Sequence, residues 1–226
     1  MAWQRLLPRP VAGFSDTREA GVFFRGVVWM QPTELFAPLA NALDARPRAP
    51  KVLVLSGPSG CGKTRLCARV AELARAQGLA VGGVLTPARY DGSRKVGLDA
   101  EDLRTGCSWP LAEGTTAADG PTTGAWHFHG AGLEAGRQAL EHAVPCHILI
   151  VDELGPLELE RGEGWRVAID VLASEQFRLG LAVVRPALVP RFLELLGVPD
   201  LPVVRVTPDH CEELAGRILS ELGDVG

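Results

Sequence analysis

A glycine-rich loop carries the strongest chemical signal in the sequence. Residues 57–64 read Gly-Pro-Ser-Gly-Cys-Gly-Lys-Thr, which fits the phosphate-binding pattern G-x-x-x-x-G-K-[ST] at every defined position. Glycines let backbone N–H groups curl around phosphate oxygens, and the helix expected next adds the partial positive charge of its N-terminus. The spacing therefore predicts a site for the phosphates of a nucleoside triphosphate.

Two side chains of this loop have specific expected roles. Lys63 should reach the β- and γ-phosphates, and the Thr64 hydroxyl should be a ligand of Mg²⁺. A nucleoside triphosphate is thus the predicted substrate, and Mg²⁺ the predicted cofactor. The residues expected to bind the nucleotide are Gly57, Pro58, Ser59, Gly60, Cys61, Gly62, Lys63, Thr64 and Arg65.

An apolar run that ends in two acids is the second signal. Residues 148–151 read Ile-Leu-Ile-Val and are followed by Asp152 and Glu153, which is typical of a buried strand that delivers carboxylates to the ligand-binding edge of a sheet. Asp152 should hold Mg²⁺, through a water, beside Thr64. Glu153 is longer by one methylene and could accept a proton from the attacking water. Lys63 and Glu153 are therefore the candidate catalytic residues.

The elements that must position these residues alternate between strand-like and helical patterns. This alternation predicts an α/β fold with a mostly parallel sheet and helices on both faces. An antiparallel hairpin turning at Asp91-Gly92 is expected within 86–103, and a mobile loop rich in Gly, Thr and Ala is expected at 113–124. Strands are expected at 52–55, 80–85, 125–128, 147–151, 179–184 and 202–206, and helices at 63–77, 133–143, 165–174, 187–196 and 209–222.

The first fifty residues have a different pattern. A strand is expected at 22–29 and a short helix at 33–43, with a proline-containing tether at 45–50. We therefore expect residues 1–50 to be an appendage and linker, and residues 51–226 to form the nucleotide-binding domain. The appendage could bind a protein partner or mediate self-association.

Composition excludes several other classes. With 226 residues, 46% of them hydrophobic and 22% charged, the chain can bury a sizeable core. The net charge of −4 provides no overall attraction to nucleic acid. Five scattered cysteines without C-x-x-C spacing indicate neither a zinc site nor a disulfide framework, and they fit reduced thiols in a cytoplasm. Neither a signal peptide nor a membrane-spanning segment is expected.

The motifs together resemble the THEP-type nucleoside-triphosphatases, a family of small P-loop enzymes. The resemblance runs from about residue 51 to the C-terminus. It rests on the loop and helix start at 57–66, on the hairpin at 83–98, and on Ile-Val-Asp-Glu-Leu-Gly-Pro-Leu-Glu-Leu at 150–159. It implies a RecA-like P-loop core, slow Mg²⁺-dependent release of phosphate and little base selectivity. It also implies the same roles for Lys63, Thr64, Asp152 and Glu153.

The chain departs from the family pattern in places that spare the phosphate machinery. Ala88 stands where the family has a hairpin acid, and Tyr90 and Lys95 stand where it has hairpin arginines. An Asn-Arg pair of the family is replaced by Asp209-His210, and residues 1–50 have no counterpart in the minimal domain. These differences concern base contacts and the role of the hairpin.

Weaker signals are outweighed by ordinary structural explanations. Any one arginine could stabilise transition-state charge, but a surface position is the default in an arginine-rich chain. His127 and His129 share a strand face but lack further metal-ligand spacing. Glu158 could support the acidic motif or be a solvated acid, and Trp109 and Trp126 could stack a base or pack in the core. The arginines in question are Arg89, Arg94, Arg104 and Arg185, and Lys95 shares the hairpin with Arg94.

Two other functions remain open at this stage. In a phosphotransferase, a small-molecule hydroxyl would replace water, and residues 113–124 could close as a lid. In a non-enzymatic nucleotide-gated module, the N-terminal region would be the effector. An ABC-type ATPase is disfavoured because no Leu-Ser-Gly-Gly-Gln signature precedes Asp152.

Overall fold

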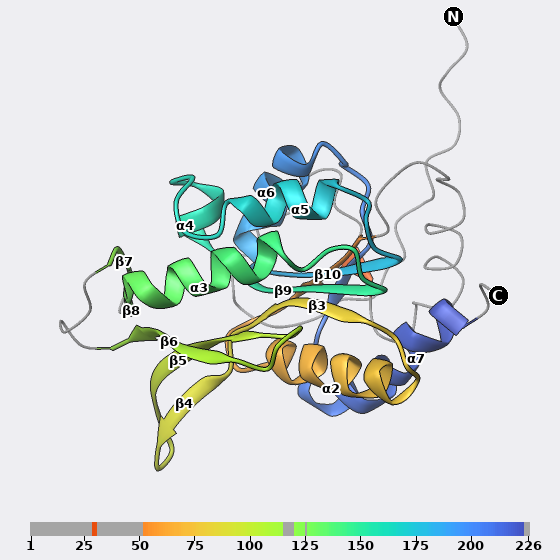
Figure 1. The fold of residues 1–226 in the computed structure, drawn as a ribbon, viewed down its shortest axis with the longest axis horizontal. Helices are drawn as coiled ribbons and strands as arrows, with labels where there is room; N and C mark the ends of the chain where they lie inside the picture. The colour runs from red at the N-terminus through yellow and green to blue at the C-terminus, as the bar shows by residue number, and fades with distance from the viewer. Residues whose placement is uncertain (1–28, 31–51, 115–119, 125, 224–226) are drawn as a thin grey trace, which may run out of the picture.

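A single mixed sheet crosses the molecule between two layers of helices (Figure 1). The structure is a computed structural model, and it describes residues 29–30, 52–114, 120–124 and 126–223. The strand order is β1-β11-β2-β10-β9-β3-β5-β6-β8-β7, and β4 pairs with β5. The strands are β1 (Trp29–Met30), β2 (Val52–Ser56), β3 (Val81–Leu85), β4 (Ala88–Asp91), β5 (Arg94–Asp102), β6 (Ser108–Glu113), β7 (Thr122–Thr123), β8 (Trp126–Phe128), β9 (Ile148–Leu154), β10 (Leu179–Val184) and β11 (Val203–Arg205).

The parallel half of the sheet carries the predicted α/β pattern. Neighbouring strands are parallel from β1 to β3 and antiparallel from β3 onward. Short connections force antiparallel neighbours, whereas parallel strands need crossovers, which here contain helices. The helices are α2 (Lys63–Ala76), α3 (Gly130–Glu141), α4 (Pro156–Leu159), α5 (Val167–Ala173), α6 (Val189–Leu196) and α7 (Cys211–Gly223), with short 3₁₀ turns η2 (Pro186–Leu188) and η3 (Pro208–His210).

Two hydrophobic cores lie on opposite faces of the sheet. Val52 and Val54 of β2 pack in a core with α3, α5 and α6. Leu53 and Leu55, which alternate with them, pack in a second core with α2 and α7. Figure 1 shows α3 to α6 on one side of the sheet and α2 and α7 on the other. This burial on both faces explains why β2 is a continuous apolar run, and the prediction of helices on both faces is confirmed.

Helix α2 ends as the sequence predicts. Gly78 has φ 75° and follows the C-cap residue Gln77. The Gly78 N–H donates to the Arg75 carbonyl at 2.9 Å, and the Leu79 N–H donates to the Ala74 carbonyl at 3.0 Å. These two hydrogen bonds form a Schellman motif, which satisfies carbonyls that the helix end leaves without partners.

The antiparallel half contains two strands that the sequence pattern does not reveal, β6 and β7. The hairpin of β4 and β5 turns after Asp91 as predicted, with Asp91 opposite Arg94. Strand β6, however, occupies 108–113, where no strand is expected, and residues at both ends of the expected mobile loop belong to β6 and β7. Pro110 hides β6 because proline cannot donate to a ladder; it sits beside a register shift opposite Asp99. Residues 115–119 of that loop lie outside the described residues.

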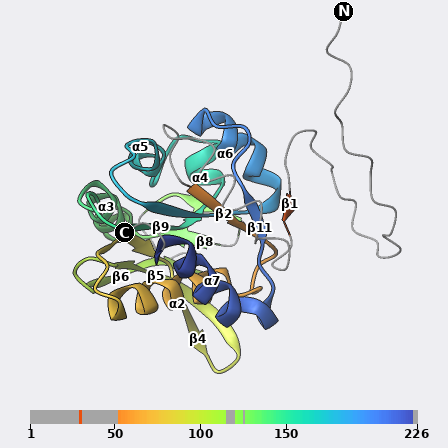
Figure 2. The same ribbon diagram turned by 90° about the vertical axis from the view of Figure 1, so that its right-hand side faces the viewer.

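The described part of the N-terminal region adds to the sheet. Strand β1 pairs in parallel with β11, with Trp29 opposite Val203, and it lies beside β11 in Figure 2. Most of the strand expected at 22–29 and all of the helix expected at 33–43 lie outside the described residues. Within the described ranges, no helix is both long enough and apolar enough to cross a membrane.

Candidate functional site

The glycine-rich loop connects the carboxyl end of β2 to the first turn of α2. Gly62, the N-cap residue of α2, has a left-handed backbone with φ 97°. A Cβ at this position would lie 2.9 Å from Cys211 Sγ of α7. Glycine is therefore needed here both for the backbone conformation and for the close approach of α7.

Lys63 is buried, and its ammonium lies within the loop. Its Nζ donates to the carbonyl oxygens of Gly57 and Pro58, both at 2.9 Å. Cys61 is also buried, with its Sγ 4.0 Å from the same ammonium. The loop thus holds a positive charge where the sequence pattern predicts phosphate.

Asp152 lies at the carboxyl end of β9, fully buried. Its Oδ2 accepts hydrogen bonds from the Thr86 N–H at 3.1 Å and from the Thr86 hydroxyl at 3.3 Å. Its Oδ1 has no hydrogen-bond partner within the described part of the chain. Burial raises the pKa of Asp152 to about 6, although the Thr86 backbone N–H and the Thr64 side chain both act to lower it.

These residues fit a hard divalent cation. A buried carboxylate oxygen without a donor is costly, and a metal ion or its bound water would satisfy it. The Thr64 hydroxyl acts on the same carboxylate, so two oxygen groups converge from neighbouring elements. Mg²⁺ prefers such oxygen ligands and completes its shell with water and phosphate.

Glu153 forms an ion pair at the same edge of the sheet. Its Oε1 accepts a hydrogen bond from Arg185 Nε at 2.5 Å. Arg185 directly follows β10, the strand that separates β2 from β9. Of the four arginines weighed from the sequence, Arg185 is therefore the one in contact with a candidate catalytic side chain.

The hairpin brings one further cation to this region. Lys95 Nζ lies 5.0 Å from the centre of the Trp126 ring, a cation–π contact between β5 and β8. Burial lowers the pKa of Lys95, while the negative charge of Glu153 acts against that shift and the charge of Arg185 adds to it. The Trp126 ring is thus in contact with the Lys95 ammonium, which is not the arrangement expected for a ring that stacks on a nucleotide base.

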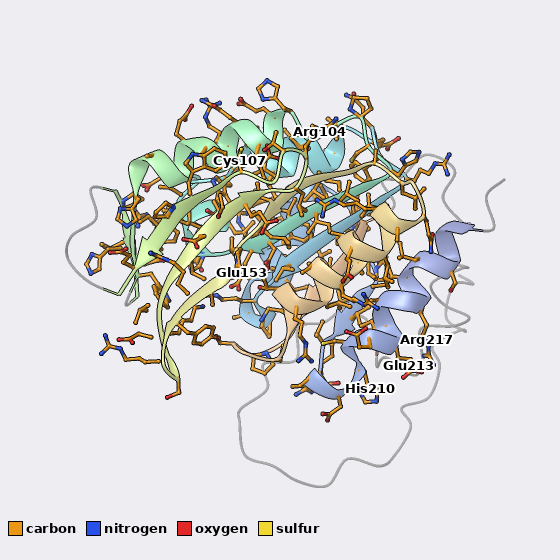
Figure 3. The ribbon with its side chains drawn as sticks, turned by 60° about the horizontal axis from the view of Figure 1, so that its bottom comes forward. Arg104, Cys107, Glu153, His210, Glu213 and Arg217 are labelled. Atoms are coloured by element: carbon orange, nitrogen blue, oxygen red, sulfur yellow. The ribbon has the colours of Figure 1, made fainter. Side chains whose placement is uncertain are left out.

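The other arginines are engaged elsewhere. Arg104 donates to the carbonyls of Ala143 and Pro145, which precede β9, so it lies at the opposite edge of the sheet from Glu153. Figure 3 shows Arg104 and Glu153 well apart. Arg89 forms ion pairs with Asp99 and Glu113 on β5 and β6, and Arg94 is exposed at the start of β5.

The remaining candidates have structural surroundings. Glu158 is buried and accepts hydrogen bonds from the Gly155 N–H at 2.9 Å and the Trp165 N–H at 3.3 Å, so it orders the turn after β9. His129 lies 3.7 Å from Glu113, and His127 lies opposite Glu113 on β8. Among the described residues, no group of three or more His, Cys, Asp or Glu side chains could hold a metal ion.

Thr86 is the site residue that sequence reasoning did not single out. It follows β3, the parallel neighbour of β9, and Val84 lies opposite Val151. A polar residue directly after a buried strand next to the acid-bearing strand is the signal that could have identified it, because parallel neighbours end at the same edge.

Comparisons with known proteins agree with this geometry. The model of a family described as NTPase matches residues 52–219. The nucleoside-triphosphatase THEP1 of Methanopyrus kandleri is 32% identical over 177 residues, covering 76% of this chain and 96% of that protein. The nucleoside-triphosphatase THEP1 of Thermofilum pendens is 30% identical over 179 residues, covering 78% and 98%.

Two solved structures share the fold. The solution structure of a human cancer-related nucleoside triphosphatase aligns with a TM-score of 0.60 at 22% identity, covering 78% of this chain and 99% of that one. The crystal structure of THEP1 from the hyperthermophile Aquifex aeolicus aligns with a TM-score of 0.57 at 19% identity, covering 75% and 97%. Sequence and fold agree: this chain belongs to the THEP-type nucleoside-triphosphatase family.

Proposed function

We propose that this protein hydrolyses nucleoside triphosphates to the diphosphate and phosphate, with Mg²⁺ as cofactor. The observation that carries the proposal is that the phosphate loop and the carboxyl end of β9 meet at one edge of the sheet. The phosphate loop holds a buried Lys63, one oxygen of the buried Asp152 has no donor among the described residues, and the Thr64 side chain acts on the same carboxylate. Membership of the family supports hydrolysis as the reaction.

The proposed chemistry assigns one task to each group. Lys63 would exchange the Gly57 and Pro58 carbonyls for β- and γ-phosphate oxygens, and Thr64 and Asp152 would hold the metal. Bound Mg²⁺ would neutralise charge on the phosphates. Glu153 would accept a proton from water as the new O–P bond forms and the β–γ bridging bond breaks, so that the diphosphate leaves with the bridging oxygen.

Water is the acceptor that the comparisons favour over a small-molecule hydroxyl, because the relatives are named nucleoside-triphosphatases. Cytoplasmic localisation is part of the proposal. It is supported by the five cysteines, all of which are free thiols.

Two substitutions test the assignment. Lys63→Ala should weaken triphosphate binding and abolish phosphate release, because the loop loses its fixed charge. Glu153→Gln should bind the triphosphate at least as well as wild type but lower turnover by about 100-fold or more, within the usual effect of removing a general base. Phosphate release from ATP, GTP, CTP and UTP with Mg²⁺ is the measurement, and binding is measured on the same proteins by calorimetry.

The matched control is Arg137→Ala. Arg137 is a partly exposed residue of α3 that pairs with Glu134 and Glu141, away from the loop. The Arg137→Ala enzyme should release phosphate at the wild-type rate. An active Lys63→Ala enzyme would remove the phosphate-loop assignment, and unchanged turnover by Glu153→Gln would remove Glu153 from the role of base.

A further inference from the structure

We propose that Arg185 is a catalytic residue that exchanges its partner, Glu153, for the γ-phosphate of a bound nucleoside triphosphate. The ion pair seen here would then be the state without a γ-phosphate. When the ion pair opens, the Arg185 guanidinium would bind the γ-phosphate, and the Glu153 carboxylate would be released in the same step. This inference rests on the proposed function, because it concerns how the same site responds to its substrate.

The position of Arg185 is fixed midway between the loop and the acids. It follows β10, where Val183 lies opposite Leu55 of β2 and Val184 lies opposite Leu154 of β9. The Ser56 hydroxyl donates to the Val184 carbonyl at 2.7 Å, a buried contact that ties the end of β10 to the start of the loop. The Cα of Arg185 is therefore anchored beside the phosphate loop and beside Glu153 together.

The tip of the side chain, in contrast, has freedom to change partner. The Arg185 side chain is 54% exposed, compared with 28% for Glu153. Its Nε binds Glu153, and within the described ranges its two terminal nitrogens have no hydrogen-bond partner. A guanidinium presents a planar fork of donors that suits two phosphate oxygens. Such a side chain can exchange a carboxylate for a phosphate by rotating about its own bonds.

The ion pair conflicts with the role proposed for Glu153. The Glu153 oxygen that accepts the 2.5 Å hydrogen bond from the Arg185 guanidinium is already occupied by that donor, so a water molecule cannot take the same position. A γ-phosphate that draws Arg185 away would free this oxygen for water. A diphosphate, which lacks the γ-phosphate, would leave the pair closed, so the site would distinguish triphosphate from diphosphate through one arginine.

No other cation described near the site is equally suited. Lys63 already has its own proposed place on the β- and γ-phosphates, and the Lys95 ammonium lies 5.0 Å from the centre of the Trp126 ring. Arg104 is bound at the opposite edge of the sheet, as described above. The backbone of Arg185 is therefore held near the proposed phosphate site, while its two terminal nitrogens remain available as donors.

A binding cycle tests the exchange without relying on turnover. Calorimetry in Mg²⁺ would compare ADP with the non-hydrolysable β,γ-imido analogue of ATP, for wild type, Arg185→Ala, Glu153→Gln and the double variant. Arg185→Ala should weaken the triphosphate analogue by about 10-fold or more and ADP by less than about twofold, as expected for one charged hydrogen-bonding group. Arg185→Lys should keep part of the preference.

The Glu153→Gln variant tests whether Glu153 and the γ-phosphate compete for Arg185. Glu153→Gln should bind the triphosphate analogue several-fold more tightly than wild type, because Arg185 no longer has a charged competitor, and the gain should vanish in the double variant. Arg191→Ala is the control, since Arg191 pairs with Glu194 on α6 with similar exposure of 45%. Thermal melts would verify that each variant is folded.

Two outcomes would overturn the exchange. One is an equal loss for ADP and the analogue, or no loss for either, in Arg185→Ala. The other is a Glu153→Gln gain that persists without Arg185. Failure of the proposed function appears differently: wild type would bind nucleotide without releasing phosphate, or Glu153→Gln would turn over normally, while the binding cycle would still give its own answer.

Discussion

Asp152 has no contact with water in the folded chain, and one of its carboxylate oxygens has no hydrogen-bond donor in the described structure. Burial raises its pKa to about 6 from an ordinary value of 3.8. Above pH 6 the folded state therefore holds a buried charge that the unfolded state would solvate. A group of this kind lowers the free energy of unfolding at neutral pH, and the proposed metal ion would offset this loss.

We predict that Asp152→Asn stabilises the metal-free protein at pH 7.5. A shift of about two pKa units corresponds to about 3 kcal/mol, so a rise in Tm of roughly 6–12 °C is expected for a chain of this size. The gain should shrink as pH falls from 6 toward 4, because folded Asp152 then carries its own proton. Thermal melts at pH 7.5 and 5 without Mg²⁺ measure it. A lower Tm for Asp152→Asn at pH 7.5 would contradict the prediction.

The sequence reveals individual chemical groups better than it reveals their partners. Lys63 and Asp152 are recognisable because glycine spacing and an apolar run restrict them locally. The pairing of Arg185 with Glu153 joins a residue directly after β10 to a residue of the neighbouring strand β9, 32 positions away, and no local pattern encodes it. Thr86 is missed for the same reason, since its importance depends on which strand lies beside β9.

At the scale of elements, the pairing of β3 with β9 requires a glycine at position 83. A Cβ on Gly83 would lie 1.9 Å from the carbonyl oxygen of Ile150, and Gly83 has φ 110°. Gly83 is three residues before Thr86, which binds Asp152. The pairing of β3 with β9 therefore depends on the absence of a side chain at Gly83. The same pairing places Thr86 where it can bind Asp152.

Gly83→Ala should lower the free energy of unfolding by more than about 3 kcal/mol, because it combines a backbone clash with a disfavoured φ. Gly92→Ala is the matched control: Gly92 also has a positive φ, 59°, but a Cβ there meets nothing within 4 Å. It should cost only about 1 kcal/mol. Urea unfolding compares them, and similar losses would show that the contact with Ile150 is unimportant.

Elements with a strong local code are predictable from the sequence. The end of α2 at Gly78 and the turn after Asp91 follow from glycine placed where the backbone needs it. Strand β6 and the single turn of α4 are not predictable in this way. Pro110 conceals the strand, and α4 depends on the buried Glu158 side chain, which binds the Gly155 N–H.

At the scale of the whole molecule, the sheet extends beyond the domain boundary expected from the sequence. Strand β1 adds Trp29 and Met30 to the edge at β11, which is also paired with β2 on its other side. Within the described residues the contact involves two residues of β1, and β11 keeps its second neighbour, β2, without them. We therefore propose that residues 51–226 fold independently.

Deletion of residues 1–48 tests this boundary. The truncated chain should keep its far-ultraviolet circular dichroism and a cooperative melt, with a Tm lowered by a few degrees at most, because each ladder hydrogen bond contributes about 1 kcal/mol net. A truncated chain without a cooperative transition would show that the N-terminal region is part of the core.

The alternation along β2 has a consequence for how this protein can change over evolutionary time. Consecutive residues of one strand belong to different cores, and the phosphate loop follows both. Each layer of helices can then accumulate its own compensating substitutions without disturbing the opposite layer, because changes without shared contacts act independently. The edge of the sheet at the phosphate loop is thus constrained, whereas the two layers of helices can diverge in sequence at different rates.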